Sequence, residues 1–597
     1  METIQEIVRK AEHDYVNNDV EISQHVRYKM FDIIQKIDAY LNSKHTSGET
    51  DSLGRQKPFF NICTSASNIW YRATELDRKN IRIVASKNED IVLAFVANVL
   101  LTDWMNRENF GQFLNNWGRT LSQYGSSVVK FVKKDGRLIP TVVPWNRLIV
   151  DSTDFDALPR IEKFYMTPSQ LRKMKQYDQE VVDNLITAVS ARKTLEGHQQ
   201  DNTDGFIELY EVHGEMDSRL LEDNPDLNIP LKDITYRQQM HVVSFVGGNN
   251  SGDYKDFTLY KGRESEDPYM ITHLIEMDGR TLSIGAVEHL FDAQWMVNHT
   301  VKQTKDYLDL ASKMFFQTSD QKFIGRNALS QLQTGDILHT TKDEPLSMVN
   351  NSAINISALQ SFGQQFMFLG KEVTSTPDAL RGNTMPSGTP YSLGALLQQE
   401  SASLFELMTE NKALALEQMM RVFVIPFLKT KMNTSKEIAS ILDENDIKQI
   451  DAMYVPKEAV RRYNEKAIED ILDGKIASPY IKSIVEEKIA GEMAPQGNTR
   501  FFKPSDISTK MWQDLLKDFE WTVRVEITNE AHDKQAVLAT LSTVFQTIAS
   551  NPMVLQDPTA KTLFGKIVNI SGAISPLELT SMSNQRSSLP AINQIQQ

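Results

Sequence analysis

The stretch Ser283-Ile284-Gly285-Ala286-Val287-Glu288-His289-Leu290 marks the point at which the pattern of the chain changes. From residue 286 to residue 316 there is no Gly or Pro, and apolar residues recur at helical spacing. A helix of that length is a rod of roughly 45 Å. The sequence therefore predicts one long helix after Gly285, with an apolar stripe that we interpret as core or neighbour packing: Val287, Leu290, Val297, Val301, Leu308, Ala311 and Phe315.

Upstream of this junction the pattern is that of strands and turns. The runs 128–134 and 138–143 are rich in β-forming residues, and Asp135-Gly136 between them is a strong hairpin signal. A helix is expected over 168–192, and residues 1 to 120 read as helical. Residues 125–280 are therefore predicted to form an α+β unit with an antiparallel sheet, with further strands at 206–213, 240–246, 257–260 and 270–276.

Downstream of the junction the chain is predicted to be mostly helical. A strand-like, Gly-broken segment, 317–351, separates the long helix from a second one. A loop at 377–390, rich in Gly and Pro, leads to a third helix over 392–432, which Pro426 should kink. Residues 521–527 alternate apolar and polar side chains, as in a strand. The expected fold class is α+β, mostly helical.

Composition excludes several classes of protein. Hydrophobic residues are 41% and charged residues 24% of 597, which excludes disorder of the whole chain. The 64 basic and 78 acidic residues give a net charge of −14, which argues against tight nonspecific coating of duplex DNA. The single cysteine, Cys63, excludes a disulfide framework within the chain. The longest mostly apolar run, 91–101, is too short to span a bilayer, so no membrane association is expected.

Catalytic motifs are largely missing from the sequence. There is no GxxxxGK[ST], HExxH, GxSxG or strand-linked GxGxxG pattern. One dense carboxylate cluster, Asp151, Asp154 and Asp156, follows a predicted strand. It fits either a divalent-cation site, as in a metal-dependent nuclease, or a solvated loop at a strand exit. His213 and Glu215 are predicted to be surface residues rather than a ligand pair.

The order of these elements, with four short phrases, resembles the portal proteins of tailed double-stranded DNA bacteriophages. The phrase 283–290, followed by Gln294 and Asn298, resembles the opening of the family's stem helix. GSSVVKF at 125–131, the Asp-Gly turn and VVPWNRLIVD at 142–151 resemble the wing hairpin and its Pro-centred phrase. LQTGDI at 332–337 resembles a clip phrase, and DALRG at 378–382 resembles the entry to the tunnel loop. The resemblance covers roughly residues 60–430.

The resemblance implies wing, stem, clip and crown regions around a central channel. The expected regions are the N-terminal helices and α+β wing (1–285), first stem helix (286–316), clip (317–353), second stem helix (354–373), tunnel loop (374–391), long wing helix and remaining wing (392–530), and crown with C-terminal tail (531–597).

The resemblance also implies a non-enzymatic function without a cofactor or metal. Portal proteins form a ring, usually of twelve subunits, at one capsid vertex of the virion, and they are assembled in the host cytoplasm. Double-stranded DNA passes through the channel during packaging and ejection, without sequence specificity. The expected partners are the large terminase, the major capsid and scaffolding proteins, and the tail or adaptor proteins that replace the terminase. Another virion ring, such as a tail connector, is the alternative, although connectors are usually much shorter.

Two sets of candidate site residues follow from the resemblance. On the first stem helix, lysines fit either positive rings around DNA or a solvated face paired with Asp306 and Asp309, and Arg381 fits either DNA contact or a role in its turn. The clip candidates fit either partner docking or a local hairpin. The channel candidates are Lys302, Lys305, Lys313, Arg381, Asn383, Thr384, Met385 and Ser387, and the clip candidates are Lys322, Phe323, Arg326 and Asp336.

Overall fold

The protein is a mixed α/β chain that divides into two compact units, which are described separately. Helix accounts for about 55% and strand for 23% of it, which confirms the predicted class at this level. The first unit comprises Met1–Glu75, Asn115–Lys133 and Ile139–Lys412, and the second comprises Leu76–Leu114, Lys134–Leu138 and Ala413–Gln597. The computed structural model describes residues 2–51, 54–76, 78, 81–84, 91–157, 159–195, 206–222, 235–247, 254–311, 315–317, 347–349, 356–376, 391–431, 438–441, 444–474, 482–493, 499–502 and 521–525.

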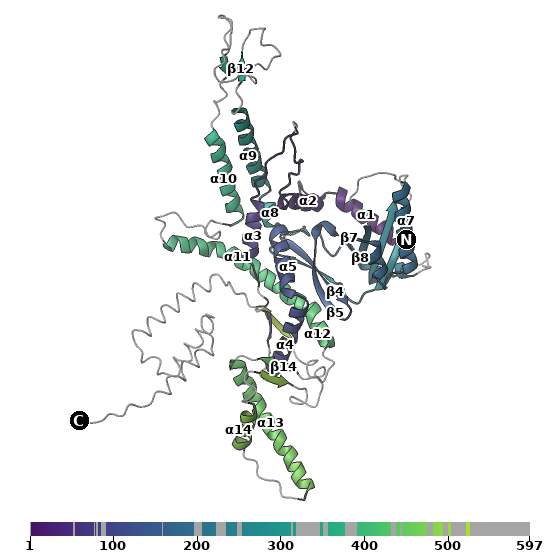
Figure 1. Ribbon diagram of the computed structural model, residues 1–597, viewed down its shortest axis with the longest axis vertical. Coiled ribbons are helices and arrows are strands. Elements are labelled where there is room, and N and C mark those ends of the chain that lie inside the picture. Colours follow the sequence, from purple (N-terminus) through teal and green to yellow (C-terminus); the bar gives the residue numbers. More distant parts are fainter. Residues whose placement is uncertain are drawn as a thin grey trace, which may run out of the picture. The chain divides into compact units, whose positions relative to one another are not determined.

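The larger sheet of the first unit has five antiparallel strands in the order β10-β9-β8-β7-β6 (Figure 1). The strands predicted at 206–213, 240–246 and 257–260 are confirmed, and each is longer than predicted. The strands are β6 (Leu148–Ile149), β7 (Arg160–Met166), β8 (Ile207–Asp217), β9 (Tyr236–Gly247) and β10 (Tyr254–Arg263).

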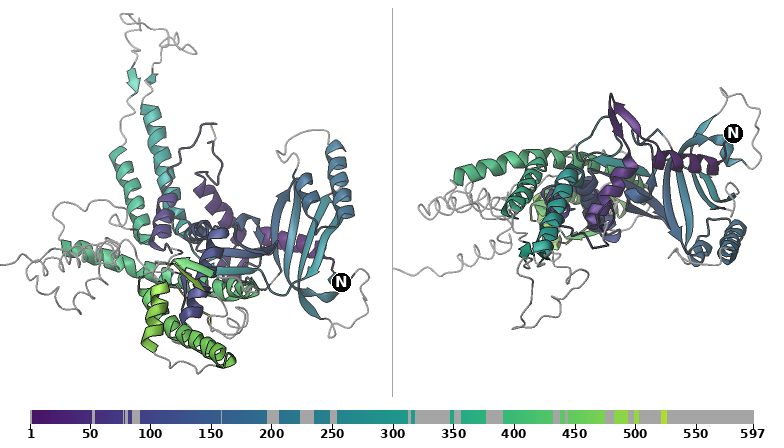
Figure 2. Two further views of the ribbon diagram at one scale, coloured as in Figure 1. Left: turned by 60° about the horizontal axis from the view of Figure 1, so that its bottom comes forward. Right: turned by 90° about the horizontal axis from the view of Figure 1, so that it is seen from above.

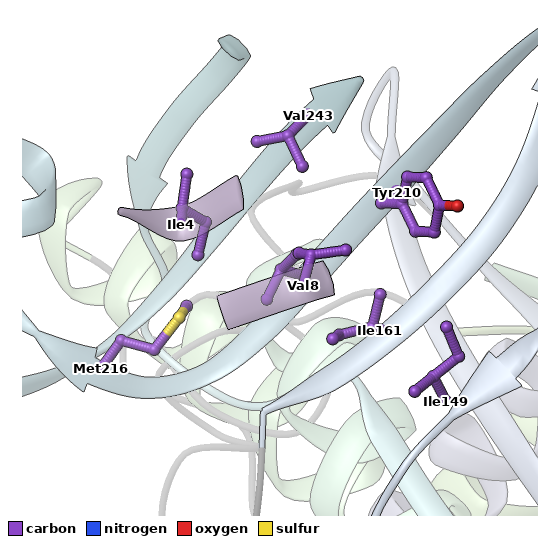
Figure 3. Packing of buried hydrophobic residues seen from close by; sticks show 8 residues of the cluster. Ile4, Val8, Ile149, Ile161, Tyr210, Met216 and Val243 are labelled. Atoms are coloured by element: carbon purple, nitrogen blue, oxygen red, sulfur yellow. The ribbon is translucent and has the colours of Figure 1, made fainter. Parts of the chain in front are cut away.

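Helices cover both faces of this sheet because side chains alternate between the faces along each strand. Figure 3 shows one core, where Ile4 and Val8 of α1 (Ile4–Asn17) pack on Ile161, Tyr210 and Val243. The opposite face packs on α6 (Pro168–Lys173) and α7 (Gln179–Leu195), the two helices that replace the single helix predicted over 168–192. This second core includes the buried Leu171, Leu185, Leu209, Val242 and Leu259.

The predicted Asp-Gly hairpin is present in a second, three-stranded sheet of order β11-β4-β5. Asp135 and Gly136 have φ of 50° and 70°, the backbone geometry that matches the twist of a two-residue hairpin. The outer strand β11 pairs antiparallel with β4. The strands are β4 (Ser126–Lys134), β5 (Arg137–Val143) and β11 (Tyr269–His273).

The long predicted helix over 286–316 is wrong in its continuity and its end. A short α8 (Ala286–His289) is followed by α9 (Phe291–Ala311), and Phe315 lies in strand β12 (Phe315–Gln317). β12 pairs antiparallel with β13 (Ser347–Val349), because consecutive aromatic residues favour an extended ladder over another helical turn. The return helix α10 (Ile356–Val373) lies beside α9 (Figures 1 and 2).

Short elements surround these helices in the first unit. The strands β1 (Val20–Ser23) and β2 (Val26–Tyr28) form a ribbon, and a 3-10 turn, Trp145–Arg147, precedes β6. A second 3-10 turn, Ser218–Leu221, follows β8. The remaining helices are α2 (Met30–Leu41), α3 (Cys63–Ala73), α5 (Phe110–Tyr124), which begins in the second unit, and α11 (Tyr391–Met419), which ends in the second unit.

The second unit is mostly helical. The kink predicted at Pro426 takes the form of a π-helical turn, Met420–Val424, between α11 and α12 (Ile425–Lys431), which accommodates the missing proline N–H. The strand predicted at 521–527 is confirmed as β16 (Thr522–Val525), which pairs with β3 (Ile81–Val84). The other elements are α4 (Ile91–Arg107), β14 (Ile438–Ile441), α13 (Glu444–Leu472), α14 (Lys482–Met493) and β15 (Thr499–Phe502).

Two further expectations concern the whole chain. Among the described residues, no helix combines the length and the apolar character that crossing a membrane requires. The region 531–597, expected to be the crown and tail, lies outside the described residues.

Candidate interaction surface of the α9–α10 helix pair

The candidate residues fall unevenly on the structure. Lys302 and Lys305 lie on α9. The other channel candidates and all clip candidates lie outside the described residues: Lys313, Lys322, Phe323, Arg326, Asp336, Arg381, Asn383, Thr384, Met385 and Ser387.

The contacts of Lys305 and of Asp306 differ from the predicted lysine–aspartate pairing. The Nζ of Lys305, an exposed residue, donates to the carbonyl of Gln56 at 3.4 Å. Asp306 instead pairs with Arg55 at 3.1 Å, and Arg55 also pairs with Asp51 at 2.8 Å. An arginine can bridge two carboxylates with its fork of donors. Arg55, in the loop between α2 and α3, therefore neutralises Asp306, rather than a lysine on α9.

The Asp151 cluster is arranged as a loop, with its carboxylates engaged separately. Asp151 Oδ1 accepts from Thr153 N at 2.8 Å, Thr153 Oγ1 at 2.6 Å and Asp154 N at 3.1 Å. Burial raises the pKa of Asp151, but these hydrogen bonds outweigh it and hold the pKa below the usual value. Asp156 forms an ion pair with Arg160. Across the described part of the chain, no group of three or more His, Cys, Asp and Glu residues could hold a metal ion.

Gln294 and Asn298, the polar residues of the stem-like phrase, fasten α9 to the segment that enters α3. Gln294 is fully buried; its Oε1 accepts from Ile62 N at 2.9 Å, and its Nε2 donates to the Phe60 carbonyl at 2.6 Å. Asn298 Oδ1 accepts from Phe60 N at 2.9 Å. The two amides satisfy backbone groups of a non-helical segment that would otherwise be buried without partners.

The inner face of the helix pair is closely packed because α10 has glycines there. A Cβ on Gly363 would lie 3.2 Å from Thr300 Cγ2, and one on Gly370 would lie 3.0 Å from Leu290 Cδ2. The end of α10 is also fixed, because Trp70 Nε1 of α3 donates to the Thr374 carbonyl at 2.9 Å. The helix pair is therefore attached to the rest of the first unit at the end that holds Leu290 and Gly370.

The predicted stripe on α9 is core only near this end. Val287, Leu290 and Val297 are buried, but Val301 is 36% and Leu308 52% exposed. The predicted apolar stripe is therefore part of the protein core only in its first turns. Further exposed apolar side chains on the pair are Trp295 (55%), Phe362 (44%), Phe368 (59%), Leu369 (44%) and Val373 (58%).

Several of these exposed side chains occupy two opposite flanks of the pair, whereas Phe368 lies on the outer side of α10, away from α9. Thr300 of α9 faces Gly363 of α10. At about 100° per residue, Trp295 and His299 lie on one side of Thr300, and Val301 and Leu308 lie on the other. Trp295 stacks on His299, with ring centroids 5.3 Å apart.

Residues of α10 extend the first of these flanks. Phe362 and Leu369 directly precede the two glycines that face α9. Because the helices run antiparallel, residues that precede the contact positions on each helix lie on the same flank. The first flank therefore comprises Trp295, His299, Phe362 and Leu369, and the second flank comprises Val301 and Leu308.

Sequence reasoning missed the two flanks and two buried cations. Helical spacing identifies an apolar stripe but does not tell whether a neighbour in the same chain covers it. His213, predicted at the surface, is 2% exposed, because Glu211, two residues before it on β8, and Glu264, just after β10, compensate its burial. Lys412 is likewise buried and donates to the Thr74 carbonyl at 2.9 Å.

Comparison with known proteins adds no functional residue to this surface. The exposed flanks and the anchored base of the α9–α10 pair are described from this chain alone. No model of a known protein family matches the sequence, and no curated protein matches it.

Proposed function

We propose that this protein is the portal subunit of a tailed double-stranded DNA bacteriophage. It forms a ring at a single capsid vertex, usually of twelve copies, through which DNA enters and leaves. The ring docks the large terminase first and tail or adaptor proteins afterwards, and it contacts the major capsid and scaffolding proteins. The subunit has no catalytic function and needs no cofactor.

The observation that carries this proposal is the presence of exposed apolar side chains on both flanks of the α9–α10 pair. An isologous dimer would cover one flank twice and leave the other in water. A head-to-tail contact, first flank against second flank, covers both and closes into a ring when the rotation between subunits is uniform. Trp295 and Phe362 supply the large apolar areas that dominate protein interfaces.

The strand pair at the end of the helices supports the same assembly. β12 and β13 are joined by three residue pairs, from Phe315↔Val349 to Gln317↔Ser347. A two-stranded ribbon of this size is marginal alone. In a ring, its outer edges can pair with ribbons of the neighbouring subunits, which is the role proposed for the clip.

The dimensions and charge of such a ring suit a DNA conduit. Twelve helices spaced about 10 Å apart give a circumference of about 120 Å and a radius of roughly 19 Å. Subtracting a helix radius of about 5 Å leaves a bore near 28 Å, wider than a duplex of about 20 Å. The net charge of −14 also favours sliding over gripping, because acidic walls do not bind phosphates.

The two flanks allow a complementation experiment. Leu369→Asp disables the first flank and Leu308→Asp disables the second, with the same residue change at similar exposure. Each variant alone should remain monomeric, because every head-to-tail contact needs one flank of each kind. A mixture should form 1:1 heterodimers and nothing larger, as read by native mass spectrometry.

Tyr236→Ser, at a 65% exposed site at the start of β9, is the control and should assemble like the unaltered protein. Rings formed by either aspartate variant alone would contradict the head-to-tail contact. Homodimers of one variant would instead indicate an isologous interface.

A further inference from the structure

A buried charge network joins the two sheets of the first unit. The β7–β8 register places Glu162 directly opposite Glu211, a like-charge pair that is unfavourable by itself. Lys130 of β4 compensates it, since its Nζ lies 2.9 Å from a carboxylate oxygen of each. The side chain of Lys130 is only 8% exposed, so this lysine is fully committed to the network.

His213 extends the network with both of its ring nitrogens. Nε2 lies 2.8 Å from Glu211 Oε1, and Nδ1 lies 2.7 Å from Glu264 Oε2. Ionised carboxylates only accept hydrogen bonds, and a neutral imidazole has one N–H donor. Two carboxylate partners therefore require the imidazolium, which donates from both nitrogens.

Glu264 begins the linker 264–268, which connects β10 of the five-stranded sheet to β11 of the three-stranded sheet. The linker is held on the larger sheet by side chains and by a backbone hydrogen bond, in which Glu264 N donates to the Gln238 carbonyl at 3.1 Å. Glu264 binds His213 of β8, and Asp267 forms an ion pair with Arg160 of β7. Just beyond the linker, the hydroxyl of Tyr269 donates to Glu162 at 3.0 Å.

We propose that His213 is a pH-sensitive latch that holds the linker 264–268 on the five-stranded sheet. When the imidazolium loses its proton, one of its two carboxylate contacts loses its donor, and a half-buried carboxylate is left without its charge partner. The contact to Glu264 is the one released. Glu211 still has its ion pair with Lys130, whereas the charge partner of Glu264 is His213. Release removes this side-chain contact and so loosens the linker, which keeps the backbone hydrogen bond of Glu264 to Gln238 and the ion pair of Asp267 with Arg160.

The groups around His213 set the direction of this switch. Glu211 and Glu264 contact it directly, Arg160 lies opposite it in the register, and Lys130, Glu162 and Tyr269 complete the network. Burial lowers the pKa of His213, but the two carboxylates outweigh burial and raise it above the ordinary value. The latch is therefore closed at acidic pH and opens as pH rises through this raised pKa.

A neighbouring histidine provides a matched control. His241 lies on β9 and is 1% exposed, but burial, Lys261 and His213 lower its pKa to about 4. It is neutral throughout the range in which His213 titrates. His241→Gln should therefore leave the pH dependence of the linker unchanged.

Hydrogen exchange of the full chain, followed by mass spectrometry and corrected for intrinsic rates, tests the latch. In the unaltered protein, opening of residues 264–273 should increase by up to about tenfold for each pH unit between the ordinary pKa of histidine and the raised pKa of His213, the limit for one proton, and should level off above it. His213→Gln should remove this dependence, since glutamine does not titrate. If exchange of residues 264–273 had the same pH dependence in His213→Gln and in the unaltered protein, the proposal would be overturned.

Glu264→Gln gives a second reading if His213→Gln folds poorly. It keeps an acceptor for the imidazole but removes the charge that favours the imidazolium. The rise in opening should then level off at lower pH and be smaller than in the unaltered protein. An unchanged midpoint in Glu264→Gln would also overturn the proposal.

Discussion

Gly125 and Gly285 lie against each other where the chain passes from the sheets to the helix pair. A Cβ on Gly285 would lie 2.5 Å from Gly125 N, and a Cβ on Gly125 would lie 2.7 Å from Gly285 N. Gly125 also has a φ of +77°, in the region that favours glycine. The two segments can therefore approach only because neither position has a side chain.

Gly285→Ala should destabilise the first unit, because the nearest atoms are backbone and cannot move aside cheaply. Overpacking of this kind costs about 1–3 kcal/mol. Urea unfolding followed by circular dichroism measures the change. Gly491→Ala, in a helical position with open space around the added Cβ, is the control and should be neutral or slightly stabilising. Equal stability of the two variants would contradict the close approach.

Gln294→Ala should lower the free energy of unfolding by about 1–3 kcal/mol, since it leaves half-buried backbone groups of Phe60 and Ile62 without the partners that this buried amide gives them. Gln303→Ala, on an exposed turn of the same helix, should change it by less than about 0.5 kcal/mol. Thermal denaturation of both variants makes the comparison. A similar loss in both would indicate that helix propensity, not the amide contacts, sets the cost.

Lys412 should make the protein more stable as pH rises above neutral. Burial lowers its pKa from 10.5 to about 7, so the unfolded chain binds more protons than the folded chain between these values. Stability should therefore rise with pH by about 1 kcal/mol per unit in this window. Lys412→Met should remove this slope, and Lys302→Met should keep it. An unchanged slope in Lys412→Met would contradict the assignment.

The purified protein should not cleave DNA in the presence of Mg²⁺ or Mn²⁺. Asp151 and Asp156 are engaged with Thr153 and Arg160, respectively, and so do not present open ligand oxygens to one ion. Isothermal titration with either cation should give no saturable heat. Cleavage that Asp151→Asn abolishes would instead support a metal-dependent nuclease.

Local signals in the sequence predicted local structure well. Asp135-Gly136 specified its hairpin because few residue pairs accept two positive φ values, and the lack of breakers after Gly285 specified helix. The end of that helix was missed because Phe315 joins β12 through pairing with Val349, which is 34 positions away. Long-range pairing of this kind has no signature in a local window.

The candidate site was less predictable, since its exposure depends on the tertiary structure. Helical spacing marks Leu308 and Val297 alike as stripe residues, but Val297 is buried whereas Leu308 is 52% exposed. The burial of His213 follows from two carboxylates, Glu211 on the same strand and Glu264, which the fold brings from beyond the end of β10. Composition and spacing carry no trace of the contact with Glu264.

Electron microscopy of the purified protein, with the mass determined in parallel, tests the central claim most directly. The proposal predicts rings whose mass is a whole multiple of 67.9 kDa. Their central hole should be wider than a DNA duplex of about 20 Å, with the α9–α10 pairs packed side by side around it. Closed particles without a channel, or rings with a hole narrower than a duplex, would contradict a DNA conduit.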